Sequence, residues 1–166
     1  MVIFARLLLL LTLCLATSAD ARETFVGQVT YVTDGDTLWV LPDRGGPARK
    51  LRIEGIDAPE ICQAGGKASR DVLAQRALHQ RVTVAVAHYD RYGRGLARIW
   101  LSGNDLGAQM VRSGQAWSYS RRPKSDSYAG EQSMAQQSRL GLFAFGAPEA
   151  PWDFRKRHGS CHVSKR

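Results

Sequence analysis

The chain has 166 residues, enough for one domain around a single hydrophobic core. Lysine and arginine number 23 against 15 aspartates and glutamates, which gives a formal net charge of +8. A surplus of this size favours polyanionic partners such as nucleic acid or an anionic membrane, although many exported basic proteins bind neither. After the N-terminal segment, no apolar run is long enough for a second membrane segment.

The N-terminal segment has the layout of a secretory signal peptide. Arg6 is the lone early charge, residues 7–13 are apolar, and residues 16–21 are small and polar. We expect residues 1–19 to be removed, by cleavage after Ala19 or Ala21. The alternative is an uncleaved membrane anchor. Cleavage would leave no stable membrane span and predicts that the protein is secreted or periplasmic.

Five short segments are predicted to be strands. Residues 23–32 are rich in Val, Thr, Phe and Tyr, and the Asp34-Gly35 pair marks a turn after them. Leu51 and Ile53 alternate with polar neighbours, as expected of a strand with one buried face. The predicted strands are 23–32, 37–41, 49–56, about 82–86 and 96–101.

Three segments have helical character, at residues 67–80, 104–113 and 127–140. Asn104 suits the N-cap of the second helix, and Gly114 suits its end. Residues 146–166 are expected to form a basic tail on the surface, after a domain at 23–145. Five strands with a helix between the third and fourth match the order of an OB-fold. The predicted class is α+β, a five-stranded OB-fold β-barrel with about three helices.

Two cysteines remain after the predicted cleavage, Cys62 and Cys161. An even number in an exported domain predicts one disulfide, which would join the C-terminal segment to the loop after Glu60. The chain-entropy model gives such a bridge about 4 kcal/mol of stabilisation. Two free thiols are the alternative.

Three stretches concentrate charge at turns and strand ends, where folding alone does not require it. They are DGDT at residues 34–37, RIEGIDAPE at 52–60 and DRYGRGLA at 90–97. Carboxylates suit a hard cation, and a planar guanidinium can bind two phosphate oxygens at once. Phosphodiester hydrolysis needs such groups, because negative charge grows on the phosphorus oxygens as water attacks. Taken singly, each motif could be a turn, a solvated strand face or a surface charge.

Together these motifs resemble the staphylococcal (micrococcal) nuclease family, over about residues 25–143. The resemblance continues through LGAQMVRSGQA at 106–116 and GLF at 141–143. It implies a secreted nuclease that depends on Ca²⁺, cuts DNA and RNA without sequence specificity, and leaves 3′-phosphate products. Such an enzyme requires no obligate protein partner.

The resemblance also assigns roles to individual residues. The positions matching the calcium ligands are Asp36, Asp57 and the backbone carbonyl of Ala58, with Asp34 as a nearby acid. Glu60 matches the carboxylate that serves as general base or orders the attacking water. The positions matching the two arginines on the scissile phosphate are Arg52 and Arg94. Arg91 and Tyr92 match further substrate contacts.

The sequence departs from the family pattern at three places. Ala58 replaces a threonine, which leaves the backbone carbonyl intact as a ligand. The loop at 61–66 is shorter and carries Cys62, so a bridge to Cys161 would stiffen the rim beside Glu60. Phe143 replaces the usual tryptophan, which is a change in packing.

Aromatic and basic residues alternate after the second predicted helix, at Trp117, Tyr119, Arg121 and Arg122. They are predicted to bind substrate, because aromatic faces stack on bases and cations meet phosphates. The alternative is that Trp117 fills the core and the arginines are ordinary loop charges. The basic run at 155–158 would either add salt-sensitive affinity for polyanions or remain a solvated tail.

Two interpretations from other classes stay open. One is a catalytically silent OB-fold module that binds nucleic acid, and the other is an envelope protein anchored by its N-terminal segment. The complete set of carboxylates and arginines favours the enzyme. An OB groove without a base-reading element also predicts a preference for unpaired strands over rigid duplex.

Overall fold

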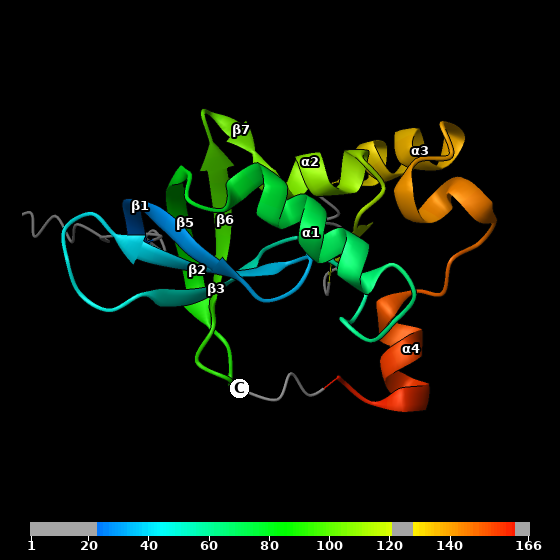
Figure 1. Cartoon of the computed structure of the whole chain (residues 1–166), viewed down its shortest axis with the longest axis horizontal. Coiled ribbons are helices and arrows are strands. Elements are labelled where there is room, and N and C mark those ends of the chain that lie inside the picture. Colours follow the sequence, from blue (N-terminus) through cyan, green and yellow to red (C-terminus); the bar gives the residue numbers. More distant parts are fainter. Residues whose placement is uncertain (1–22, 121–127, 162–166) are drawn as a thin grey trace, which may run out of the picture.

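The computed structural model describes residues 23–120 and 128–161. The predicted signal segment, Arg121 and Arg122 lie outside the described residues. Five strands form a closed barrel beside a group of helices (Figure 1). These strands are β1 (Glu23–Val32), β2 (Thr37–Pro42), β3 (Arg49–Ile53), β5 (Arg81–Tyr89) and β6 (Gly95–Leu101). The predicted α+β class and five-stranded OB-fold barrel are confirmed.

The barrel closes through a parallel pairing between β3 and β6. The antiparallel order is β3-β2-β1-β5-β6, and the register from Leu51↔Gly95 to Ile53↔Ala97 joins its two ends. Alternating side chains point inward, so that Leu51 is fully buried and Ile53 nearly so. This closure places Arg52 beside Leu96, near the start of β6.

The predicted third strand is divided in two. β3 ends at Ile53, and the short β4 (Ile56–Asp57) follows a turn in which Gly55 adopts a φ of 84°. β4 pairs with β8 (Trp117–Ser118), in the register Asp57↔Trp117. A further two-residue strand, β7 (Asn104–Asp105), extends the sheet from β6.

The helices differ from the prediction in number and in their ends. Among the described residues they are α1 (Gly66–Ala77), α2 (Leu106–Arg112), α3 (Ala129–Gln137), the 3-10 helix η1 (Gly141–Phe145) and α4 (Pro151–His158). α1 stops at Ala77 because Leu78 is extended and His79 is left-handed. The cap of α2 is Asp105 rather than Asn104, since its carboxylate accepts the Ala108 N–H.

α4 lies in the segment expected to be a surface tail. It begins with a proline in its first turn, which suits that position, and Pro151 is buried. Trp152 packs against a second hydrophobic cluster formed by Trp117, Ala135 and Phe143. α4 is thereby part of the fold, on the opposite side of the helical group from α3 (Figure 1).

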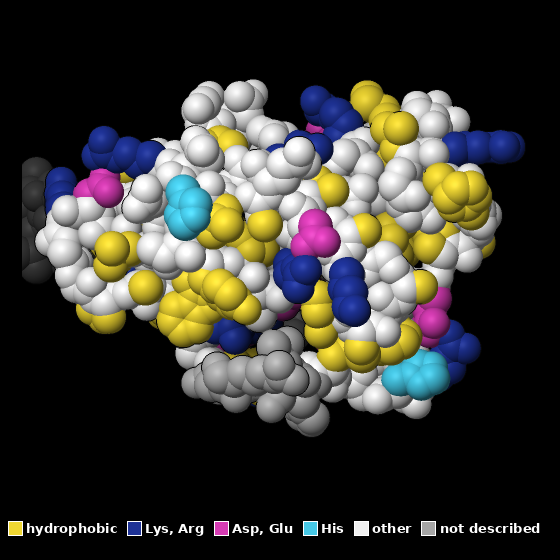
Figure 2. All heavy atoms as spheres, viewed as in Figure 1, with side chains coloured by type: hydrophobic (Ala, Val, Ile, Leu, Met, Phe, Trp, Pro, Cys, Tyr) yellow, Lys and Arg dark blue, Asp and Glu magenta, His cyan; other side chains and the backbone are white. Residues whose placement is uncertain are grey.

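The surface shows no concentration of basic residues on the face in Figure 2. Lysine and arginine side chains lie scattered there among hydrophobic, acidic and polar ones. None of the helices within 23–120 and 128–161 is long and apolar enough to cross a membrane.

Gly66, at the start of α1, contacts the backbone that carries Glu60. A Cβ at this position would lie 1.9 Å from the Glu60 carbonyl oxygen, whereas a Cβ on Gly130 in α3 would meet nothing within 4 Å. We therefore expect Gly66→Ala to lower the free energy of unfolding by about 1–3 kcal/mol, measured by urea denaturation. Gly130→Ala is the matched control and should be neutral or stabilising, because alanine favours a helix over glycine. Equal effects at both glycines would contradict the close approach.

Candidate active site

The centre of the candidate site is the guanidinium of Arg52, which joins two buried carboxylates. Its Nη1 donates to Asp36 Oδ1 at 2.6 Å, and its Nη2 donates to Asp57 Oδ1 at 2.8 Å. Asp36 is 3% exposed and Asp57 is completely buried. Pairing of β3 with β2 sets Arg52 opposite Thr37, the residue after Asp36. Strand register therefore brings Arg52 to Asp36, whereas Asp57 lies on β4, shortly after Arg52 in the sequence.

Asp36 is held by donors from three directions. Besides Arg52, the Thr37 hydroxyl donates to Oδ1 at 2.8 Å and the Ala58 N–H donates to Oδ2 at 3.0 Å. Burial opposes ionisation of Asp36, but the Arg52 charge and these hydrogen bonds outweigh it and hold its pKa below the usual value. Asp36 is thus an ionised carboxylate in the interior.

Asp34 has the opposite electrostatic character. Burial, and then repulsion from the Asp36 carboxylate, raise the pKa of Asp34 to about 8. Its Oδ1 accepts the backbone N–H of Asp36 at 3.0 Å, so it shapes the turn that presents Asp36. Asp34 is therefore protonated at neutral pH and adds no charge to the site.

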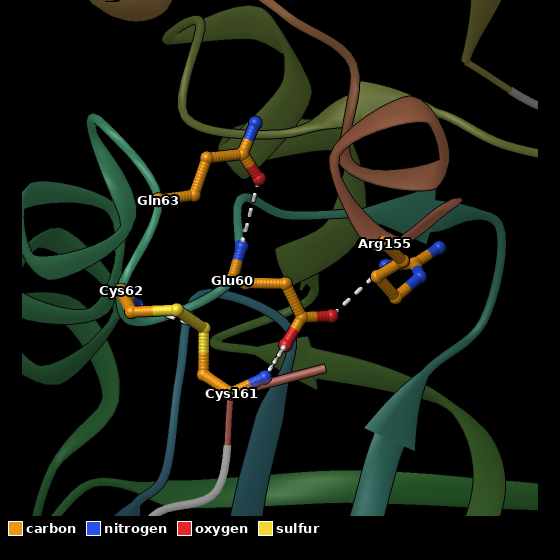
Figure 3. The surroundings of a disulfide bond; sticks show 5 residues. All are labelled: Glu60, Cys62, Gln63, Arg155 and Cys161. Atoms are coloured by element: carbon orange, nitrogen blue, oxygen red, sulfur yellow. Dashed lines mark hydrogen bonds and ion pairs between the residues drawn. A yellow bond between two sulfur atoms is a disulfide. The ribbon is translucent and has the colours of Figure 1, made fainter. Parts of the chain in front are cut away.

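Glu60 lies in the loop between β4 and α1. Its side chain points toward Arg155 and Cys161 (Figure 3). Its backbone N–H donates to Gln63 Oε1 at 3.1 Å, and Gln63 Nε2 donates to the Glu149 carbonyl at 2.7 Å. The Glu60 carboxylate accepts from Arg155 Nη1 at 3.1 Å and from the Cys161 N–H at 3.3 Å. Both of its oxygens therefore have partners near the C-terminus of the chain.

Arg155, on α4, is the site residue that the sequence analysis did not identify. It donates to Asp57 Oδ1 at 3.1 Å and to Asp57 Oδ2 at 2.7 Å, in addition to Glu60. These hydrogen bonds to Asp57 raise the pKa of Arg155. A signal was present in the sequence, because Trp152 stands one helical turn earlier and indicates that this basic segment packs on the domain.

The predicted disulfide between Cys62 and Cys161 is present. The two Cα atoms lie 5.9 Å apart, and the bridge joins positions separated by 99 residues. The Cys62 N–H also donates to Cys161 Sγ at 3.2 Å. The bridge lies next to Glu60, as Figure 3 shows, so it forms part of the wall around this carboxylate.

Arg94 lies in the turn between β5 and β6, close in register to Arg52. Leu96, two residues later, pairs with Arg52 across the β3–β6 closure. In this structure the Arg94 side chain donates to Asp90 Oδ2 at 2.8 Å, and Asp90 Oδ1 accepts the N–H groups of Tyr92 and Arg94. The described contacts of Arg94 are with its own turn rather than with Asp36 or Asp57.

Tyr92 projects from this turn between two cations. Its side chain is 66% exposed, and the guanidinium carbons of Arg91 and Arg94 lie 4.9 and 5.4 Å from its ring centre. An exposed ring flanked by arginines suits contact with a base and its phosphates. The geometry is consistent with the predicted substrate roles of Arg91 and Tyr92 and does not test them.

Trp117 does not have the exposure that a stacking platform needs. It is 6% exposed and packs edge-on against Phe143 at 5.7 Å and Trp152 at 6.5 Å. Its burial matches the alternative considered from the sequence, in which it fills the core. Tyr119 is partly exposed and stacks at a tilt on Trp152, 5.7 Å away.

Few side chains at this site are available as ligands for a metal ion. Across 23–120 and 128–161, no group of three or more His, Cys, Asp and Glu side chains has the arrangement of a metal centre. Asp36 and Asp57 share Arg52, and the Ala58 backbone touches Asp36. Two carboxylates and a nearby backbone carbonyl are all oxygen donors, which suits a hard cation such as Ca²⁺.

Removal of the Arg52 charge should destabilise the metal-free protein. We expect Arg52→Met to lower its free energy of unfolding by about 3 kcal/mol, since Asp36 and Asp57 lose the cation that offsets their burial. Urea denaturation in the presence of chelator measures this. Arg91→Met, on the exposed turn, is the control and should change stability by less than about 0.5 kcal/mol. Equal losses in both variants would show that Arg52 is not holding the carboxylates.

Comparisons with known proteins agree with this geometry. A family model described as "Staphylococcal nuclease homologue" matches residues 50–144. An "Uncharacterized endonuclease" of Haemophilus influenzae is 33% identical over 156 residues, which cover 94% of this chain and 85% of the relative. A "Micrococcal nuclease" of Shigella flexneri is 33% identical over 153 residues, covering 86% and 87%.

A plant relative matches a smaller part of its own length. A "Probable staphylococcal-like nuclease CAN1" of Oryza sativa subsp. japonica is 34% identical over 114 residues, covering 68% of this chain and 34% of the relative. The family model spans more than half of this chain, and the bacterial relatives match along most of their length. The chain therefore belongs to the staphylococcal nuclease family.

Proposed function

We propose that this nuclease is a secreted or periplasmic, Ca²⁺-dependent enzyme that hydrolyses DNA and RNA without sequence specificity and leaves 3′-phosphate ends. The observation that carries the proposal is the junction of Arg52 with two buried carboxylates, with Glu60 beside them through Arg155. A nuclease of this kind needs three groups close together: a metal site, a positively charged side chain that binds the phosphate, and a carboxylate that deprotonates or orders the attacking water. These groups meet here.

The residues have separate tasks in this mechanism. Asp36, Asp57 and the Ala58 carbonyl would hold Ca²⁺, which supplies positive charge to the phosphodiester as it is attacked. Arg52 donates three hydrogen bonds within the protein. Because a guanidinium has five N–H donors, some remain for phosphate oxygens.

Glu60 and Arg94 would act on opposite sides of the phosphorus. Glu60 would accept a proton from the attacking water or order that water, at a carboxylate whose orientation is set by two hydrogen bonds. Arg94 would leave Asp90 to bind a phosphate oxygen or the leaving oxygen, which requires only a rotation of its side chain.

Export is supported by the cysteines. A disulfide between distant parts of the chain is expected in a secreted or periplasmic protein, because the bacterial cytosol keeps thiols reduced. The signal-like segment at residues 1–19 agrees with this compartment. Ca²⁺ would then be taken from the medium.

The activity can be tested by release of acid-soluble nucleotides from denatured DNA. We expect cleavage with Ca²⁺ and none with chelator, and a loss of at least about a hundredfold in Glu60→Gln, since the water loses its proton acceptor. The matched control is Glu131→Gln on α3, where the carboxylate pairs with Arg112. New 5′-hydroxyl ends should accept label from polynucleotide kinase without prior dephosphorylation.

Inactivity of the wild type would favour the alternative function. If the protein retards nucleic acid on a gel but cleaves nothing across pH and Ca²⁺ concentration, it is a binding module of the cell envelope. Cleavage that persists in chelator would refute the metal dependence alone.

Substrate preference depends on the exposed turn at Tyr92. We expect faster cleavage of single strands than of matched duplex, because an exposed aromatic ring stacks on unpaired bases. Tyr92→Ala should lower the rate on single strands about tenfold, and the rate on duplex less. Tyr31→Ala is the control, since Tyr31 is 56% exposed on β1, away from this turn. Equal wild-type rates on the two substrates would contradict the preference.

A further inference from the structure

Arg155 has contacts that the proposed mechanism does not use. Its guanidinium donates hydrogen bonds to both oxygens of Asp57 and to one oxygen of Glu60. Asp57 is the proposed metal ligand, and Glu60 is the carboxylate proposed to deprotonate or order the attacking water. Asp57 is completely buried, and the Arg155 side chain is 29% exposed. A cation so placed must affect whatever binds these two carboxylates.

Two independent attachments hold α4 over the site. Near its start, Trp152 packs on Trp117 and Tyr119, and the Glu149 carbonyl accepts from Gln63. After its end, Cys161 is bonded to Cys62. Arg155 lies between these attachments, so its position over Asp57 and Glu60 is fixed from both sides.

Arg155 changes the net charge of the group of ionic side chains at the site. Three carboxylates, those of Asp36, Asp57 and Glu60, are paired with two guanidinium groups, those of Arg52 and Arg155. The cluster therefore has one excess negative charge. Without Arg155 it would have two, which would attract a divalent cation more strongly and repel a phosphodiester more strongly.

We propose that Arg155 is a positioning residue of the active site, whose guanidinium orients Glu60 and competes with the metal for Asp57. This inference rests on the proposed function. In the metal-free protein Arg155 takes the place of a cation and stabilises the buried carboxylates. Metal binding displaces it from at least one Asp57 oxygen in this proposal, so the metal affinity is lower than the carboxylates alone would give.

The direction of the effect on metal affinity separates this role from a structural one. Damage to the fold weakens metal binding, whereas loss of a competing cation strengthens it. By isothermal titration with Ca²⁺ alone, we expect Arg155→Gln to bind the ion about tenfold more tightly or better than the wild type. Arg157→Gln, on the same helix and paired with Glu149, is the matched control and should bind as the wild type does.

Thermal stability provides a second measurement without substrate. Arg155→Gln should lower the Tm of the metal-free protein, because the buried carboxylate of Asp57 loses a cationic partner. The difference from the wild type should shrink when Ca²⁺ is saturating, since the tighter-binding variant gains more from the ion. A difference that is the same with and without Ca²⁺ would show a purely structural role.

Kinetics test the effect on Glu60. Arg155→Gln should reach half-maximal activity at a lower Ca²⁺ concentration, yet have a lower kcat because Glu60 is no longer held. Arg155→Lys keeps the charge and should restore the wild-type Ca²⁺ requirement, but recover kcat only in part, since lysine lacks the forked geometry. Should Arg155→Gln not fold, Arg155→Lys still tests the proposal through this separation of metal requirement from kcat.

The Cys62–Cys161 disulfide should affect Ca²⁺ binding through the position of Arg155. The Cys62→Ser, Cys161→Ser double variant should bind Ca²⁺ more tightly than the wild type, and its effect should be much smaller when Arg155→Gln is already present. Unchanged or weaker Ca²⁺ binding by a folded Arg155→Gln protein would overturn the inference. That result leaves the nuclease proposal intact, whereas a wild type that neither binds Ca²⁺ nor cleaves would refute the proposed function itself.

Discussion

The arrangement of the site depends on one interaction, the forked contact of Arg52 with Asp36 and Asp57. Burying two carboxylates this deeply is costly without a cation between them. Arg52 holds the pKa of Asp36 below its usual value, and Asp36 and Asp57 in turn raise the pKa of Arg52 despite its burial. The same contact holds two oxygen-donor groups close together.

The strand pairings around the barrel bring the residues of this contact together. The β2–β3 register sets Arg52 against the turn that carries Asp36, and the short β4–β8 pair holds Asp57 against Trp117. Closure of β3 on β6 pairs Arg52 with Leu96, two residues after Arg94. Each charged group is thus placed by backbone hydrogen bonds, which do not depend on a bound ligand.

Much of this could be predicted from the sequence, because it is local. Strand-forming composition, alternation and turn signals located the five strands. The charged motifs, through their resemblance to the family, indicated Asp36, Arg52, Asp57, Glu60 and Arg94. The ends of elements were less accurate. Gly55 interrupts the third strand, and the left-handed His79 follows α1, which stops short of the predicted end. Trp117, in a segment rich in aromatic and basic residues, proved to be a packing residue.

The contribution of α4 could not be predicted in the same way. Arg155 meets Asp57 across 98 residues of sequence, and the local pattern of a basic segment does not indicate which of its residues faces a distant carboxylate. Its neighbours Lys156 and Arg157 give the segment the composition of a solvated tail. Only the packing of Trp152 and the bridge at Cys161 show that one of these basic residues faces the site.

The most direct test of this account is the crystal structure of the protein grown with Ca²⁺ and a short oligonucleotide, with the ion located by anomalous scattering. The account predicts one ion between Asp36 and Asp57, in contact with the Ala58 carbonyl, with Arg52 on a phosphate oxygen and Arg155 displaced from at least one oxygen of Asp57. An ion bound elsewhere, or Arg155 still on both oxygens of Asp57 with the ion in place, would contradict it.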